Sequence, residues 1–390
     1  MSTNGCLLKM NAHAQEDISA FLNERIAAND FPSAVYLVAE KGEIVFQDAL
    51  GFAVVEPERI PATMDTIYDL ASLTKVLVTG LLTAVLVVKG ELELEGLAAK
   101  VLPRFGSSKN SDVTIRQLLT HTSGFPAWLP FYLMPAGRDI EATIADASSK
   151  AGQEAVTYSD LNFLTLQIVV EKIFGQKIHA AAERIVFAPL GLRDTFYNPS
   201  AELKSRIAAS EKGNEYEKKT CVELGYLATD GQAGMLAAPV GSAFRNQQIW
   251  GEVHDGNAYF MGGVAGHAGL FSTAGEVFKI AEQFLPNYTK ILKPETCELF
   301  RTNFTPGLNE DRSFAFQLAS TKDSTAGTKM PPESFGHLGF TGTSLWIDPV
   351  NERIFILLTN RTHHHELPFV NINSVRRKFH DLAIDSLQKK

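Results

Sequence analysis

The sequence predicts an α+β protein in which both ends of the chain build one antiparallel sheet and the middle forms an inserted all-helical region. Two observations carry this prediction. Runs rich in β-branched and aromatic residues lie near both termini, and helical periodicity of apolar residues dominates from about residue 72 to residue 300. Because the termini of a domain usually lie close together, one sheet drawn from both ends, and flanked by helices, satisfies this order.

The first expected element is an amphipathic helix over residues 18–26, whose apolar residues recur at helical spacing. Strand-like runs at 33–40 and 43–50 flank a turn that contains Gly42, which predicts an antiparallel hairpin. At the other end of the chain, a helix is expected from about residue 375 to residue 387. The two termini therefore supply helices as well as strands.

Three more strands are expected before the C-terminal helix, at 314–319, 335–347 and 353–360. We place domain boundaries so that a discontinuous sheet domain, residues 1–90 and 301–390, encloses a mainly helical domain, residues 91–300. The helices expected between the strands cover residues 76–88, 115–119, 161–174, 178–186 and 277–284.

The composition is that of a globular protein, with 45% hydrophobic and 21% charged residues. The net charge of −8 without a Lys/Arg-rich block argues against nucleic acid as a partner. No secretory signal begins the chain, and the longest apolar run, 76–88, is too short to span a membrane. A cytoplasmic protein is therefore expected. Its three cysteines, Cys6, Cys221 and Cys297, are expected to be free thiols.

The segment Ser72–Lys75 (SLTK), at the head of the most apolar helix, carries the clearest chemical signal. A spacing of three places the Ser72 hydroxyl and the Lys75 amine on one face of a helix. Apolar neighbours are expected to bury Lys75 and lower its pKa toward that of a useful base. On spacing alone, a helix-capping serine with a solvated lysine is an equally good interpretation. A second copy, Ser386–Lys389, lies at the charged C-terminus and is interpreted as chance.

Other catalytic motifs are absent from the sequence. There is no Gly-x-Ser-x-Gly turn, no phosphate-binding glycine loop, no dinucleotide-binding glycine pattern and no His-Glu-x-x-His helix. No cofactor and no metal are therefore expected.

Five segments, in order, resemble the serine β-lactamase and penicillin-binding-protein-like superfamily, and most of all its class C-like branch with D-aminopeptidases and family VIII esterases. The resemblance covers about residues 31–360. It implies a β-lactamase/transpeptidase-like fold, with the active site in the cleft between the sheet and the helical region. The segments are Asp69–Lys75, Gln117–Phe125, Tyr158–Asp160, Gly266–Ala274 and His337–Gly339.

The resemblance implies three catalytic side chains. Ser72 would be the nucleophile that forms an acyl-enzyme, and Lys75 would take its proton. Tyr158 would share proton transfer with the lysine and protonate the leaving group; a packing role for Tyr158 is the alternative.

The family's late Lys-Thr-Gly element has no exact counterpart here, but two His-x-Gly triplets exist. His337 lies in a strand-like segment and is assigned to the lysine position as a catalytic residue, whereas His267 is interpreted as loop structure. The resemblance then places the oxyanion hole at the backbone N–H groups of Ser72 and Phe340.

Departures from the family pattern bear on the substrate. His337 and Leu338 replace a lysine and a threonine that would hold a penicillin carboxylate. Asp160 replaces an asparagine, and an anionic side chain there suits a free substrate amine. These changes weaken the β-lactamase interpretation. Substrate-binding residues are expected at Asp160, Leu338, Gly339 and Trp128.

Four further features allow alternatives. The Pro-interrupted aromatic segment 125–134, which contains Trp128, either walls an acyl pocket or packs into the helical region. His121 is expected to be structural. His254-Asp255 is expected in a loop held by side-chain hydrogen bonds, with ligand contact as the alternative. The run 363–366 (HHHE) is not expected to bind metal, because adjacent residues of an extended segment point to opposite sides.

The sequence therefore predicts a serine hydrolase that acts through a Ser72 acyl-enzyme on small esters, amides or β-lactams. A penicillin-binding or DD-peptidase relative and a D-aminopeptidase-like enzyme are alternatives, although the missing signal sequence argues against cell-wall work. A non-catalytic acyl-binding sensor module is the alternative of another class. A small-molecule substrate is the expected partner, and the oligomeric state is left open.

Overall fold

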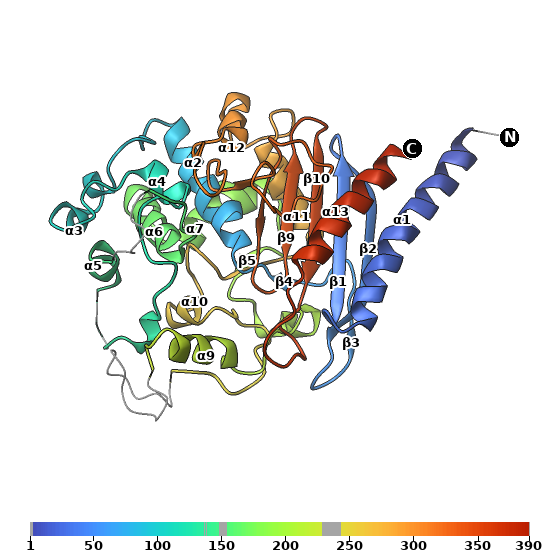
Figure 1. Ribbon diagram of the computed structural model, residues 1–390, viewed down its shortest axis with the longest axis horizontal. Coiled ribbons are helices and arrows are strands. Elements are labelled where there is room, and N and C mark those ends of the chain that lie inside the picture. The colour runs from blue at the N-terminus through green and yellow to red at the C-terminus, as the bar shows by residue number, and fades with distance from the viewer. Residues whose placement is uncertain (1–2, 136, 138, 148–153, 228–242, 390) are drawn as a thin grey trace.

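A seven-stranded antiparallel sheet, in the order β3-β2-β1-β10-β9-β8-β7, forms the centre of the computed structural model (Figure 1). The structure describes residues 3–135, 137, 139–147, 154–227 and 243–389. Strands β1 (Ser33–Glu40) and β10 (Arg353–Thr359) lie side by side, with Ala34 opposite Thr359. The two ends of the chain therefore meet in one sheet, as the sequence predicted.

Strand β1 is buried on both faces because its alternating side chains enter two different cores. Val35 and Leu37 belong to the large core shared with the helical region. Tyr36 and Val38 belong to a smaller core on the opposite face. The remaining strands of the sheet are β2 (Glu43–Val54), β3 (Ile60–Pro61), β7 (Gln317–Leu318), β8 (Phe335–Leu338) and β9 (Ser344–Asp348).

Helices cover both faces of the sheet. The terminal helices α1 (Thr3–Ala27) and α13 (Asn373–Gln388) pack together on the side of the smaller core (Figure 1). Helix α11 (Ala274–Ala281) lies on the other face against β1 and β10. Both predicted terminal helices are therefore present, and each is longer than predicted.

The helical region is the left half of Figure 1. A π-helical turn, Lys75–Gly80, leads directly into α2 (Leu81–Val88), where the sequence predicted one regular helix. The other helices are α3 (Pro103–Gly106), α4 (Ile115–Leu119), α5 (Ile140–Ala145), α6 (Asp160–Phe174), α7 (Ile178–Ala182), α8 (Ala188–Leu190), α9 (Glu215–Glu223), α10 (Gly256–Phe260) and α12 (Glu298–Arg301).

Two predictions of strands need correction. The run 335–347 is not one strand, because Gly339–Thr343 forms a turn in which Gly339 N–H donates to Thr343 O at 2.8 Å. A second sheet pairs β4 (Tyr68–Asp69), in the predicted sheet domain, with β6 (Leu270–Ser272), which also pairs with β5 (Phe196–Tyr197); β5 and β6 lie within the region predicted to be mainly helical. These strands are two or three residues long, too short for a periodic signal.

No helix in the described ranges has the length and hydropathy needed to cross a lipid bilayer. The domain boundaries at residues 90 and 301 and the cytoplasmic location stay predictions.

Candidate active site

A sharp turn presents Ser72 at the start of its helix. Both oxygens of the Asp69 carboxylate are used: Oδ1 accepts the Ala71 N–H at 2.9 Å and Oδ2 the His254 N–H at 2.7 Å. Ala71 adopts a left-handed conformation, φ +47°, which is uncommon for a residue with a Cβ. The chain thus turns between β4 and the helix, and Ser72 lines the central pocket.

Lys75 lies directly beneath Ser72, with its side chain fully buried. Its Nζ donates to Ser72 Oγ at 2.9 Å and to His267 O at 3.1 Å. The same Nζ lies 2.8 Å from Asp160 Oδ1. The structure therefore brings Ser72, Lys75 and Asp160 together, and the solvated-lysine interpretation does not apply.

The pKa of Lys75 is raised, contrary to the prediction. Burial by itself lowers the pKa, but the negative charge of Asp160 and the interaction with Tyr158 outweigh burial and raise it above the ordinary value. The prediction was wrong because the apolar neighbours are adjacent in sequence, whereas Asp160 is brought in by α6.

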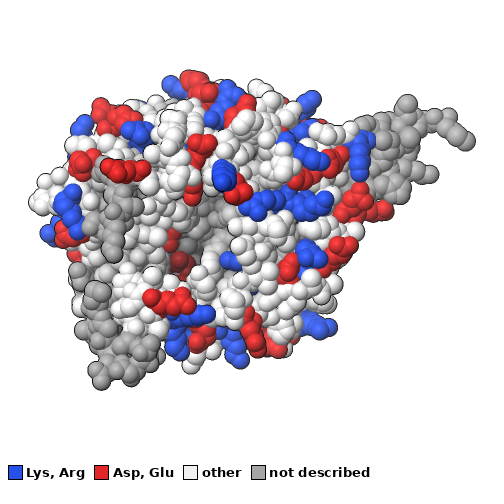
Figure 2. All heavy atoms as spheres, viewed as in Figure 1, with Lys and Arg blue, Asp and Glu red and all other residues white. Residues whose placement is uncertain are grey.

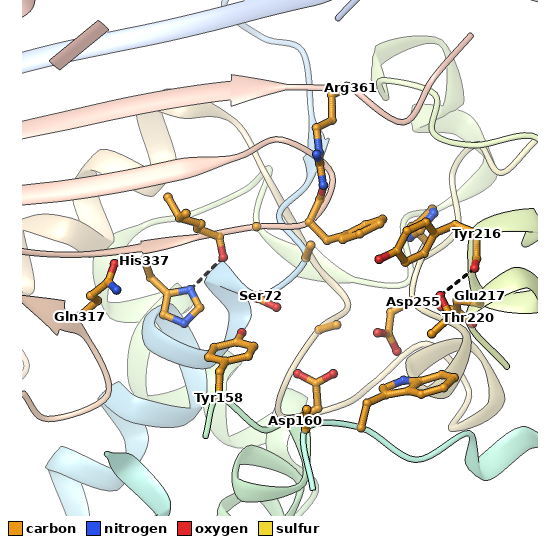
Figure 3. A pocket seen from close by; sticks show the side chains of 18 of the residues that line it. Ser72, Tyr158, Asp160, Tyr216, Glu217, Thr220, Asp255, Gln317, His337 and Arg361 are labelled. Atoms are coloured by element: carbon orange, nitrogen blue, oxygen red, sulfur yellow. Dashed lines mark hydrogen bonds between the residues drawn. The ribbon is translucent and has the colours of Figure 1, made fainter. Parts of the chain in front are cut away.

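Tyr158 precedes α6, whose N-terminus is capped by the Ser159 hydroxyl. Its ring centroid lies 4.6 Å from that of His121 and 5.1 Å from Lys75 Nζ. The Arg312 guanidinium lies 5.7 Å from the same ring. Three groups therefore fix the Tyr158 ring, and Figure 3 shows it beside Ser72 and His337.

His337 lies on β8 opposite Leu345 of β9. Its Nδ1 is 2.9 Å from Leu338 O, so Nδ1 carries the proton and Nε2 is an acceptor. Burial, and then the charges of Lys75 and Arg312, hold the pKa of His337 well below its ordinary value. His337 is therefore a neutral imidazole at physiological pH, and its buried Nε2 has no partner among the described residues.

The backbone N–H groups of Ser72 and Phe340 have no hydrogen-bond acceptor within the described part of the chain. Both residues line the same pocket. Two free donors beside a serine hydroxyl are the arrangement that an oxyanion needs.

The pocket has a volume of about 640 Å³. Figure 2 shows it as a hollow near the middle of this face, with acidic side chains inside. Leu338 and Gly339 line one wall, and Trp128, Tyr216 and Leu224 give apolar surface elsewhere. All the predicted substrate-binding residues thus lie at one pocket.

The aromatic segment 125–134 both packs into the helical region and contributes to the wall of the pocket. Phe125 and Phe131 are buried in the large core. Trp128 lines the pocket and packs against Tyr132, with ring centroids 6.3 Å apart.

The sequence interpretation missed a contact between His267 and a residue of the pocket wall, Asp255. His267 Nε2 lies 3.0 Å from Asp255 Oδ1, and Asp255 lines the pocket. Burial raises the pKa of Asp255, but the charge and hydrogen bond of His267 outweigh it and lower the pKa overall. The Gly266–Ala274 motif pointed to this loop without indicating what His267 contacts.

Donor atoms of Asp160, Asp255 and His267 lie within 4.8 Å of one another, a grouping that resembles a metal site. The Lys75 ammonium already contacts Asp160 Oδ1 and His267 O. One of the three donor groups, the Asp160 carboxylate, is therefore already paired with the Lys75 cation.

Arg312 was also missed. It is buried and pairs with Glu310, its Nη2 lying 2.6 Å from Glu310 Oε2. Both residues line the pocket on the side of Tyr158 and His337. No local pattern marks an arginine for this position, because its contacts form through the fold.

Three further histidines, His121, His254 and His363, have structural partners. His121 Nδ1 accepts the Ser159 N–H at 3.0 Å. His254 Nε2 lies 2.7 Å from Glu211 Oε2, so side-chain hydrogen bonds hold this loop, and His254 and Asp255 line the pocket; ligand contact stays a prediction. In the run 363–366, His363 Nδ1 contacts Ser210 O at 3.0 Å.

An antiparallel sheet covered by helices, with a serine and a tyrosine lining one pocket and a buried lysine in contact with the serine, defines a serine hydrolase-like protein. The family model described as Beta-lactamase matches residues 18–375, and the chain belongs to this family.

Curated relatives and solved structures agree with this assignment. A protein of Escherichia coli (strain K12) named "Putative D-alanyl-D-alanine carboxypeptidase" is 30% identical over 359 residues, 85% of this chain and 79% of that protein. EstCE1, described as a hydrolase with promiscuous acyltransferase activity, superposes with a TM-score of 0.68 at 20% identity, covering 96% and 98% of the two chains. A class C β-lactamase from Rhodobacter sphaeroides gives a TM-score of 0.66 at 17% identity, covering 95% and 99%.

Proposed function

We propose that this protein is a serine hydrolase that is acylated at Ser72 by small esters and amides and then releases the acyl group to water. The observation that carries the proposal is the contact of 2.9 Å between Ser72 Oγ and Lys75 Nζ, beside the free backbone N–H groups of Ser72 and Phe340. A hydroxyl next to a proton acceptor and two amide donors suits attack on a carbonyl carbon.

In the proposed reaction, Ser72 Oγ attacks the carbonyl and its proton passes to the neutral form of Lys75. The carbonyl oxygen becomes an oxyanion held by the N–H groups of Ser72 and Phe340. Tyr158 donates its hydroxyl proton to the leaving group and regains one from Lys75. Water then attacks the acyl-enzyme, the acid leaves, and Ser72 recovers its proton.

The side chains of the β8 strand favour esters and amides over β-lactams. His337 is neutral and Leu338 has no hydroxyl, so the strand lacks the cation and donor that would pair with a β-lactam carboxylate. β-Lactams are the weaker expected substrates.

Three observations favour D-amino-acid peptides as a second candidate substrate class. The relatives named putative D-alanyl-D-alanine carboxypeptidases cover most of the chain. In this chain, Arg312 lies beside Tyr158 and suits a terminal carboxylate, although Glu310 already pairs with it. Asp160 and Asp255 suit instead a free amine, as in an amino-terminal D-residue.

The test is incubation with a p-nitrophenyl ester, nitrocefin, a D-alanyl amide and an acylated D-alanyl-D-alanine, followed by intact mass measurement. An acyl adduct that is absent in Ser72→Ala is the expected result. Ser386→Ala, in the second Ser-x-x-Lys copy, is the matched control and should retain the adduct. If no substrate gives either turnover or an adduct, the non-catalytic sensor module would be favoured.

A further inference from the structure

Each of the two proposed oxyanion donors belongs to a peptide unit whose carbonyl is held from behind. In a trans peptide the C=O and N–H bonds point in opposite directions, so a group that binds the carbonyl oxygen also fixes the direction of the N–H. In the peptide between Ala71 and Ser72, Thr74 is that group. Its N–H and its hydroxyl donate to Ala71 O at 3.0 and 2.6 Å.

The peptide between Gly339 and Phe340 is held by a cation instead. Arg376, on α13, donates from Nη2 to Gly339 O and to Thr343 O, both at 3.0 Å. The Gly342 N–H adds a bond of 3.1 Å to Gly339 O. Arg376 is only 4% exposed, so this contact is shielded from bulk water.

The charge of Arg376 has no anionic partner. Across the ranges that the structure describes, no carboxylate lies within ion-pair distance of Arg376 or of its neighbour Arg361. Burial and the charge of Arg361 lower the pKa of Arg376 to about 9, so Arg376 remains a cation at neutral pH. A buried, uncompensated cation is costly, which calls for a role beyond packing.

We propose that Arg376 is a positioning residue of the oxyanion hole: it orients and polarises the Gly339–Phe340 peptide so that the Phe340 N–H binds the substrate oxyanion more strongly. The inference rests on the proposed function. A cation at the carbonyl oxygen draws electron density from the amide nitrogen and strengthens its N–H as a donor. A donor held in place beforehand needs no reorganisation when negative charge develops.

Arg361 offers a matched control. Its Nε donates to Phe340 O at 2.8 Å, and its guanidinium lies 5.0 Å from the Phe340 ring. Phe340 O belongs to the next peptide, whose N–H is that of Thr341. Arg361 and Arg376 both line the pocket, so Arg361→Met removes a neighbouring pocket cation while it leaves the contact between Arg376 and Gly339 in place.

The experiment is infrared spectroscopy of the acyl-enzyme formed from p-nitrophenyl acetate with an isotope-labelled carbonyl, together with the acylation rate from the p-nitrophenol burst. Loss of a whole oxyanion donor slows reactions by about 10²–10³-fold, so we expect Arg376→Met, which weakens one donor, to acylate about 10-fold more slowly. The labelled carbonyl band should move to higher wavenumber in Arg376→Met. Arg376→Lys should recover part of both effects because it keeps the charge.

Each other outcome has a defined meaning. If Arg376→Met and Arg361→Met have the same band position and the same acylation rate, Arg376 has only a structural role. If Arg376→Met does not fold, Arg376→Gln carries the same test, since it keeps a hydrogen-bond donor and loses the charge. If the wild-type protein shows no labelled carbonyl band that depends on Ser72, the proposed function is overturned, and this inference falls with it. The comparison is with Ser72→Ala, which cannot form the acyl-enzyme.

Discussion

Lys75 Nζ lies 2.8 Å from Asp160 Oδ1 and 2.9 Å from Ser72 Oγ, so one buried cation joins the proposed nucleophile to a carboxylate. A buried cation is retained only with a partner of opposite charge or strong hydrogen bonds. Lys75 must be neutral before it can accept the proton of Ser72. Asp160 therefore controls how readily Lys75 reaches this neutral form.

Asp160→Asn should move the rising limb of the pH–rate profile, along which Lys75 loses its proton, to lower pH. The Asp160 charge raises the pKa of Lys75, so its removal lets the neutral amine form at lower pH. The measurement is kcat/KM for a p-nitrophenyl ester between about pH 6 and about pH 11. Asp194→Asn, which breaks the distant pair with Arg206, is the control. An unshifted limb in Asp160→Asn would contradict the role of Lys75 as base.

Tyr158→Phe should lower kcat by about 10²–10⁴-fold while the melting temperature changes little. The phenyl ring can keep the packing against His121 and Lys75, and only the hydroxyl is lost. Steady-state kinetics and thermal unfolding measured on one preparation check this prediction. Tyr259→Phe, at an exposed position outside the pocket, should leave both quantities unchanged. A Tyr158→Phe enzyme of wild-type activity would leave Tyr158 with packing alone.

His337 should contribute no ionisation near neutral pH. Its pKa is held well below the ordinary value by burial and by Lys75 and Arg312, so it stays neutral across the working range. The wild type and His337→Asn should therefore share the position of the acid limb of kcat/KM, even if their rates differ. A limb near pH 6.5 that disappears in His337→Asn would be the opposite result.

Glu217→Gln should remove a loss of stability between about pH 4.5 and pH 7. Burial, and then the charge of Asp255, raise the pKa of Glu217 from 4.5 to about 7 in the folded protein. Because the pKa of Glu217 is higher in the folded than in the unfolded protein, protonated Glu217 contributes to the free energy of unfolding. This contribution is fully present below the unfolded pKa and is lost as pH rises through the folded pKa. The loss is about 3 kcal/mol above pH 7.

The Gln side chain keeps the bond from the Gly256 N–H, 2.7 Å from Glu217 Oε1, and does not titrate. The free energy of unfolding, measured with denaturant at about pH 5 and about pH 8, should therefore be higher for the variant relative to the wild type at pH 8 than at pH 5. The control Glu223→Gln changes an exposed residue on the same helix and should show no such difference. Equal pH dependence of the wild type and Glu217→Gln would refute the prediction.

The strongest local patterns predicted the fold well. The hairpin at 33–50 and the meeting of the chain ends in one sheet were confirmed because hydrophobic periodicity and turn residues act over a few neighbours. The turn Gly339–Thr343 was missed because strand-forming residues surround it on both sides. Tertiary hydrogen bonds with Arg376, not propensity, hold that turn.

For the site, the sequence determined the identities and spacing that matter within one turn of helix. Ser72 and Lys75 lie three residues apart, so their contact follows from helix geometry alone. Their electrostatics were decided by the tertiary structure. Asp160 approaches Lys75 from α6, and Arg376 reaches Gly339 from 37 residues away, because charge interactions depend on separation in space and not along the chain. Folding therefore fixed the pKa of Lys75 and the cation behind the Phe340 amide, which no local pattern encodes.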